Sequence, residues 1–142
     1  MASNPVFLDT NGWVALLNRE DSLHSTAAKA WRRLGRAGYS MVLTDWIIAE
    51  TGNTLARTVV RRDFPEGVQR LLRLPHARIV FVTPAIMERA LLLYSDRPDK
   101  NWGLVDCASF VVMKNEGITE AFTTDRHFEQ AGFNCLLPAS AV

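Results

Sequence analysis

The feature that most constrains the fold of this chain is the alternation of short apolar runs with longer amphipathic segments. Runs typical of buried strands occupy 6–9, 41–43, 79–82, 118–123 and 135–137, and helical segments separate them. Strands that alternate with helices form a parallel sheet covered on both faces. The sequence therefore predicts an α/β fold, a three-layer α/β/α sandwich with a central parallel sheet.

Capping residues mark the ends of the helical segments. Ser22 is expected to cap one helix and Thr44 or Asp45 the next, Pro84 suits a first helical turn, and Gly117 is a typical helix stop. The expected helices cover about 12–18, 22–36, 45–62, 64–74, 84–95, 103–116 and 126–130.

The length and composition are those of one globular domain. At 142 residues the chain is expected to form a single domain over 1–142. No apolar run approaches the roughly 18 residues of a membrane span, and the N-terminus lacks the pattern of a secretory signal. The sequence predicts a cytoplasmic protein without a membrane partner. The two cysteines, Cys107 and Cys135, lack the spacing of a zinc site or a disulfide scaffold.

Four acidic residues fall where the predicted elements could bring them together. Asp9 closes the first strand and Asp125 follows the fourth, at the strand ends where open α/β sheets build their sites. Glu50 lies within the 45–62 helix and Asp106 near the start of the 103–116 helix. Clustered carboxylates repel one another and take up protons unless cations neutralise them. We therefore expect a divalent-metal site.

Each acid also has a simpler structural interpretation. Asp9 could be a turn or cap residue, Asp106 could complement the dipole of its helix, and Asp125 could cap the 126–130 segment. Glu50 could be an ordinary surface charge. The independent occurrence of all four around one sheet edge favours the metal site.

Basic residues near these acids are candidates for binding substrate phosphates. The net charge is only +1, so any nucleic-acid binding has to depend on local patches. At 3.6 residues per turn, Arg57 and Arg61 would share the helix face of Glu50, and Arg126 directly follows Asp125. Surface charges that only aid solubility are the alternative interpretation.

The sequence resembles the PIN-domain family. The resemblance rests on the segments Phe-Leu-Asp-Thr-Asn at 7–11, Ile-Ala-Glu-Thr at 48–51, Val-Asp-Cys-Ala-Ser-Phe at 105–110 and Thr-Thr-Asp-Arg-His-Phe at 123–128. It is closest to the small stand-alone PIN proteins that include VapC-type toxins. It implies a ribonuclease dependent on Mg²⁺ or Mn²⁺, often a homodimer and often held inactive by an antitoxin.

The resemblance also assigns roles to residues. Asp9, Glu50 and Asp106 match the main metal-binding set, and Asp125 matches a more variable fourth acidic position; Thr10 or Asn11 would orient a water on the metal. The segment before the third acid commonly reads Ser-Leu-Thr-Asp in the family but is Gly-Leu-Val-Asp here, at 103–106. Two hydroxyl groups that would support the site are absent, which puts its metal affinity or efficiency in question.

Mg²⁺ and Mn²⁺ prefer oxygen ligands, and metal-activated water hydrolyses phosphodiesters, so the chemistry fits RNA cleavage. A non-cleaving module that binds RNA or protein would keep the same fold, and the missing hydroxyls favour that alternative. A receiver-like or phosphatase-like domain would need paired acids after the first strand, which are absent. Gly-rich phosphate-binding loops are also absent.

Overall fold

The protein has a central sheet of five parallel strands, in the order β3-β2-β1-β4-β5. This computed structural model describes residues 4–139. Every observed pairing is parallel, as predicted. The strands are β1 (Pro5–Leu8), β2 (Ser40–Thr44), β3 (Ala77–Val80), β4 (Glu120–Phe122) and β5 (Asn134–Cys135).

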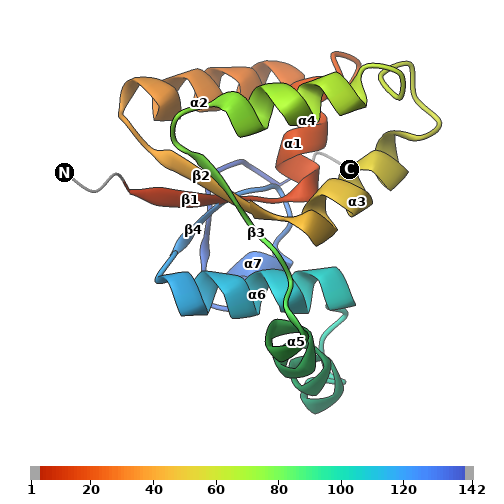
Figure 1. The fold of residues 1–142 in the computed structure, drawn as a ribbon, viewed down its shortest axis with the longest axis vertical. Coiled ribbons are helices and arrows are strands. Elements are labelled where there is room, and N and C mark those ends of the chain that lie inside the picture. The colour runs from red at the N-terminus through yellow and green to blue at the C-terminus, as the bar shows by residue number, and fades with distance from the viewer. Residues whose placement is uncertain (1–3, 140–142) are drawn as a thin grey trace.

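Helices cover both faces of this sheet, which confirms the three-layer prediction. In Figure 1, α1, α2 and α4 lie on one side of the sheet, and α6 and α7 lie on the other, with α5 packed against α6. The helices are α1 (Thr10–Leu17), α2 (His24–Arg36), α3 (Asp45–Leu55), α4 (Phe64–Arg73), α5 (Pro84–Asp96), α6 (Leu104–Glu116) and α7 (His127–Gln130).

The strand order places a topological switch between β1 and β4. From β1 the chain moves outward through β2 to the edge strand β3, and it then returns to form β4 on the other side of β1. Neighbouring connections leave the sheet in opposite directions at such a point, and ligands bind beyond the carboxyl ends of the strands there. Asp9 and Asp125 follow these two strands.

Close packing of α1 on β4 fixes the geometry of this edge. A Cβ atom at Gly12 would lie 2.2 Å from the carbonyl oxygen of Phe122, so the approach requires a residue without a side chain. The fully buried side chains of Phe7, Phe122 and Phe128 form part of the core beneath it.

The predicted helix over 45–62 is wrong at its C-terminal end, because α3 stops at Leu55 and residues 56–63 form turns. The Thr58 hydroxyl donates to the carbonyl of Leu55 at 2.7 Å, an alternative to continuing the helix. Phe64 then packs against Trp13 and close to Gly52, which turns the chain back onto α3. Arg57 and Arg61 therefore do not extend the helix face of Glu50.

The predicted capping role of Ser22 is also wrong. Helix α2 begins at His24 after Leu23, without a side-chain cap. The Asp21 carboxylate accepts a hydrogen bond from the backbone N–H of Leu23 at 2.9 Å instead.

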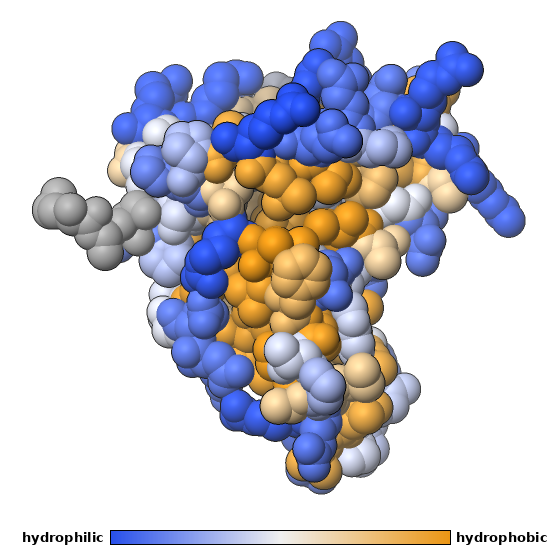
Figure 2. Space-filling view, in the orientation of Figure 1, coloured by the Kyte–Doolittle hydropathy of each residue, from blue (hydrophilic) through white to orange (hydrophobic). Residues whose placement is uncertain are grey.

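Apolar side chains remain exposed around β3 and α5. Figure 2 shows them gathered across the middle of one face, where β3 lies. The exposed large apolar residues of this part of the chain are Leu72, Leu74, Phe81, Met87, Leu91, Leu92 and Tyr94. None of the helices within residues 4–139 is long and apolar enough to cross a membrane.

Candidate active site

Asp9 occupies the most buried position of the carboxylate cluster. It follows β1 and precedes the first residue of α1, and only 3% of its surface is exposed. Its Oδ2 atom accepts a hydrogen bond of 2.6 Å from the hydroxyl of Thr123, which follows β4. The polar residues that directly follow the neighbouring strands β1 and β4 thus contact each other.

Asp106 lies in the first turn of α6. Its Oδ2 atom accepts a hydrogen bond from the backbone N–H of Gly103 at 3.1 Å, which is one half of a capping box. The same oxygen lies 3.2 Å from Nδ1 of His127. Helices α6 and α7 therefore meet at this carboxylate.

Asp125 lies between β4 and α7. Its Oδ1 atom accepts a hydrogen bond of 2.9 Å from the backbone N–H of His127 and lies 3.4 Å from Nδ1 of the same residue. One ligand atom each from Asp106, Asp125 and His127 can be chosen so that all three lie within 4.8 Å of one another. The structure thus brings Asp106, Asp125 and His127 together, and neither Asp9 nor Glu50 belongs to this group.

The three aspartates share one pattern of hydrogen bonding. Asp9 and Asp106 are held through Oδ2, and Asp125 is held through Oδ1. The backbone N–H of Thr10 also interacts with the Asp9 carboxylate and lowers its pKa. Within residues 4–139, the second oxygens of Asp106 and Asp125 make no hydrogen bond or ion pair, so both side chains are oriented by the protein and each retains an oxygen for another ligand.

The electrostatics of the cluster disfavour three negative charges. Burial raises the pKa of Asp9 to about 7, although the Thr123 hydroxyl opposes the rise, and the charges of Asp106 and Asp125 add to it. Burial and the charge of Asp125 also raise the pKa of Asp106. A divalent cation would offset the part of these shifts that comes from repulsion between the carboxylates.

Glu50 lies on α3 and is half-buried. The next residue, Thr51, donates its hydroxyl to the Thr10 hydroxyl at 3.3 Å and to the carbonyl of Ile47 at 2.7 Å. This contact ties α3 to the start of α1, next to Asp9. In the described part of the chain, the Glu50 carboxylate itself makes no hydrogen bond or ion pair.

The candidate supporting residues Thr10 and Asn11 differ in their surroundings. Thr10 is buried, and its hydroxyl joins α1 to α3 through Thr51. Asn11 is exposed in the first turn of α1. Of the two, only Asn11 lies open to a substrate.

The three candidate phosphate-binding arginines do not form one group. Arg57 is exposed in the 56–63 turns, and Arg61 donates to the carbonyl of Ala56 at 3.2 Å. Arg126 is paired with Glu129 and donates to the carbonyl of Leu137 at 2.7 Å. Arg126 thus fastens the chain after β5 to α7.

The sequence did not identify Thr123 or His127 as residues that support the carboxylates. Both lie within the Thr-Thr-Asp-Arg-His-Phe segment at 123–128. Their positions between carboxylates depend on contacts between distant segments, which short motifs do not reveal.

The simpler capping interpretations are also partly correct. Asp106 caps α6 through the backbone of Gly103, and Asp125 accepts from the first residue of α7. Each uses one oxygen for this purpose, so capping and metal binding are compatible.

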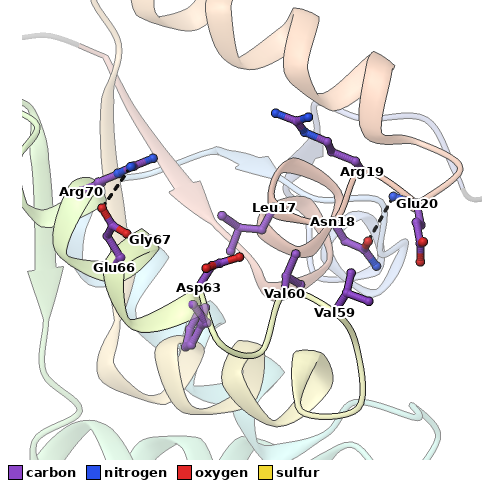
Figure 3. Close-up of a pocket in the computed structure, with 11 residues that line it drawn as sticks. Leu17, Asn18, Arg19, Glu20, Val59, Val60, Asp63, Glu66, Gly67 and Arg70 are labelled. Atoms are coloured by element: carbon purple, nitrogen blue, oxygen red, sulfur yellow. Dashed lines mark hydrogen bonds and ion pairs between the residues drawn. The ribbon is translucent and has the colours of Figure 1, made fainter.

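A separate groove of about 540 Å³ lies away from the carboxylates. It runs between the end of α1, the 56–63 turns and α4, as Figure 3 shows. Leu17, Val60 and Phe64 contribute apolar surface, while Asp63 and Arg70 contribute charge. None of the four candidate acids lines it.

Comparisons with known proteins agree with this geometry. The PIN domain family model matches residues 6–134. The 23S rRNA-specific endonuclease VapC20 of Mycobacterium tuberculosis, found in strains H37Rv and CDC 1551, is 30% identical over 129 residues, which cover 90% of this chain and 95% of the relative.

Solved structures give the same result for the fold. The crystal structure of M. tuberculosis VapC20, described as a sarcin-ricin loop cleaving toxin, superposes with a TM-score of 0.81 at 28% identity, covering 90% of this chain and 95% of that one. FitAcB from Neisseria gonorrhoeae superposes with a TM-score of 0.67 at 19% identity, covering 94% and 97%, which supports the fold alone.

Proposed function

The chain belongs to the PIN-domain family, and we propose that it is a divalent-metal-dependent endoribonuclease that acts as the toxin of a toxin-antitoxin pair. One observation carries the proposal. Asp9 and Asp125 follow the two strands of the β1/β4 switch, Asp106 lies in the first turn of α6, and hydrogen bonds from the protein orient all three carboxylates. The relationship to VapC20 supports ribosomal RNA as the substrate class, and such an enzyme would act in the cytoplasm.

The donor set fits Mg²⁺ or Mn²⁺. Asp9, Asp106 and Asp125 would hold the ion through carboxylate oxygens, and Glu50 would contribute from α3. Hard cations prefer oxygen ligands and retain waters, so positions remain for a substrate phosphate. When bound, the ion would polarise the phosphodiester and activate water for hydrolysis.

The protein's own contribution is to orient these carboxylates through hydrogen bonds. The Thr123 hydroxyl and the Gly103 backbone fix two carboxylates before any ion arrives, so little rearrangement opposes binding. Asn11, Arg57 and Arg61 are exposed and remain proposed contacts for water or backbone phosphates. Arg126 is the weakest of the proposed phosphate contacts, because its guanidinium is already engaged.

A nuclease assay tests the proposal most directly. Purified protein is expected to cleave RNA in the presence of Mg²⁺ or Mn²⁺, and EDTA is expected to abolish the cleavage. Asp9→Asn, Glu50→Gln and Asp106→Asn should each lower cleavage by at least about 100-fold, and Asp125→Asn should lower it less. Asp63→Asn is the matched control, because Asp63 is exposed in the groove of Figure 3.

Near-wild-type cleavage by two of the three principal variants would contradict the assignment. Metal binding without cleavage of any RNA tested would favour the non-cleaving module instead. The Gly103 contact to Asp106 weighs against that alternative, since the carboxylate is oriented even without the hydroxyls.

Self-association is part of the same proposal. The exposed large side chains of Phe81, which directly follows the edge strand β3, and of Leu91 and Tyr94 on α5 are the surface that supports a homodimer. Sedimentation equilibrium would measure the association state, and inspection of the neighbouring genes would test for an antitoxin.

A further inference from the structure

His127 contacts two of the carboxylates through one ring atom. Its Nδ1 lies 3.2 Å from Oδ2 of Asp106 and 3.4 Å from Oδ1 of Asp125. When both carboxylates are ionised they only accept hydrogen bonds, so these contacts are made by the tautomer that carries its hydrogen on Nδ1. A ring nitrogen that carries this hydrogen donates to the carboxylates and does not itself bind a metal.

The two aspartates depend on His127 to different degrees. Asp125 Oδ1 accepts from the backbone N–H of His127, a contact that any residue at this position would make. Asp106 Oδ2 receives the ring as its second donor, after the backbone N–H of Gly103. The side chain therefore matters chiefly for Asp106.

The ring is held in place by the residues beside it. Phe128 is fully buried and packs against Phe7 and Phe110. On the other side, Arg126 joins α7 to the carbonyl of Leu137. These contacts fix the start of α7, while the His127 side chain remains 30% exposed.

We propose that His127 is a positioning residue that turns Asp106 so that Oδ2 faces the protein and Oδ1 faces the metal, an inference that rests on the proposed function. It takes over the support that a hydroxyl residue at 103 or 105 would supply. Although Gly103 and Val105 lack hydroxyl groups, Asp106 is then held by His127 of α7 and by the backbone at the start of α6.

Metal affinity of the full-length protein tests this role without relying on activity. Calorimetric titration with Mg²⁺ and with Mn²⁺ would compare the wild type with His127→Leu, His127→Asn and His127→Gln. The Leu variant should lose about 10–100-fold in affinity for both ions, as expected when a group that orients a ligand is removed.

The two amide variants separate positioning from general structural effects. The Asn side chain can place an N–H near the position of Nδ1, so it should recover most of the affinity. The longer Gln side chain places its N–H nearer the position of Nε2 and should recover little. Melting in EDTA should be similar for all three variants, because the side chain is partly exposed and the backbone contact to Asp125 remains.

Three results would overturn the role. Unchanged affinity in His127→Leu would mean that Asp106 is held by Gly103 alone. Recovery of metal affinity by His127→Gln and not by His127→Asn would show that the required donor is not at the position of Nδ1. A loss for Mn²⁺ much greater than for Mg²⁺ would identify the imidazole as a metal ligand. Absence of metal binding by the wild type would instead overturn the proposed function, and this inference with it.

Discussion

The Thr123 hydroxyl donates a hydrogen bond of 2.6 Å to Oδ2 of Asp9, across a sequence separation of 114 residues. Both residues are almost fully buried, and each directly follows a strand at the β1/β4 switch. The bond favours the ionised carboxylate and so opposes the effect of burial. It therefore holds Asp9 closer to the charged form that binds a cation.

Thr123→Val should weaken metal binding at neutral pH. Without the hydroxyl, the pKa of Asp9 rises further above its present value of about 7, so a larger fraction is protonated and the ion has to displace that proton. A hydrogen bond to a charged group contributes about 1.5–3 kcal/mol, so affinity should fall by roughly 10-fold or more at pH 7.

Titrations of metal affinity between pH 5.5 and 9 would measure the effect. The midpoint for Thr123→Val is expected about one pH unit higher than that of the wild type. Thr123→Ser keeps the hydroxyl and serves as the control. Identical profiles for Val and wild type would show that Thr123 does not control the charge of Asp9.

The metal-free protein should lose stability as the pH rises. The pKa of Asp9 is raised in the folded state, from 3.8 to about 7, so the folded protein holds a proton that the unfolded chain releases. Its contribution is fully present below about pH 4 and is lost as the pH rises to about 7, by roughly 4 kcal/mol. The raised pKa of Asp106 acts in the same direction.

Asp9→Asn should remove most of this dependence. Urea unfolding in EDTA is expected to show the variant about 1–3 kcal/mol more stable than the wild type at pH 8, with a smaller difference at pH 5. The range is below the full effect because one amide N–H is left to find a partner. Asp63→Asn should keep the wild-type profile, and a wild-type stability that does not fall between pH 5 and 8 would contradict the prediction.

Gly12→Ala should destabilise the protein and loosen the site. The added methyl group would lie 2.2 Å from the carbonyl oxygen of Phe122 and 2.6 Å from its ring, so α1 has to move away from β4. Overpacking of this kind costs about 1–3 kcal/mol or more. The shift would also separate Asp9 from Thr123 and reduce metal affinity.

Gly35→Ala provides the matched control on α2. No atom lies within 4 Å of a Cβ at that position, so the change should be neutral or stabilise by up to about 1 kcal/mol. Chemical denaturation and metal titration of both variants would measure the difference. Equal stability of the two variants would show that the approach of α1 to β4 is not tight.

The strands and most helix ends were predictable because local sequence determines them. Thr83 and Pro84 begin α5 as expected, and Gly117 ends α6 in the left-handed conformation with φ of 68°. Apolar runs identified all five strands to within a few residues. Asp9 and Asp125 could be placed for the same reason, since each follows a strand, and Asp106 lies in the first turn of a helix, whereas Glu50 lies in the middle of α3.

The remaining features depend on contacts between distant segments. The end of α3 at Leu55 reflects the packing of Phe64 on Trp13 and near Gly52, together with the hydrogen bond from Thr58 to the Leu55 carbonyl. The bonds from Thr123 to Asp9 and from His127 to Asp106 require the sheet order and the side-chain conformations. Because α3 ends at Leu55, the helical periodicity wrongly placed Arg57 and Arg61 on the helix face of Glu50.

The last prediction concerns the two missing hydroxyl groups before Asp106. Gly103 has an ordinary φ of −74°, and a Cβ there would meet only Asp106 Oδ2, at 3.9 Å, so serine fits. Its hydroxyl could cap the first turn of α6, but glycine is already an acceptable cap. Gly103→Ser should therefore add only about 0.5 kcal/mol of stability and change metal affinity little.

Val105→Thr should behave differently. Val105 is partly buried and packs against the hydrophobic core, so a hydroxyl there loses apolar contact and gains no evident partner. We expect a loss of about 1 kcal/mol in the free energy of unfolding, without tighter metal binding. Melting and metal titration of both single variants would measure these effects. A clear gain in affinity from either variant would show that the site lacks support that Gly103 and His127 do not supply.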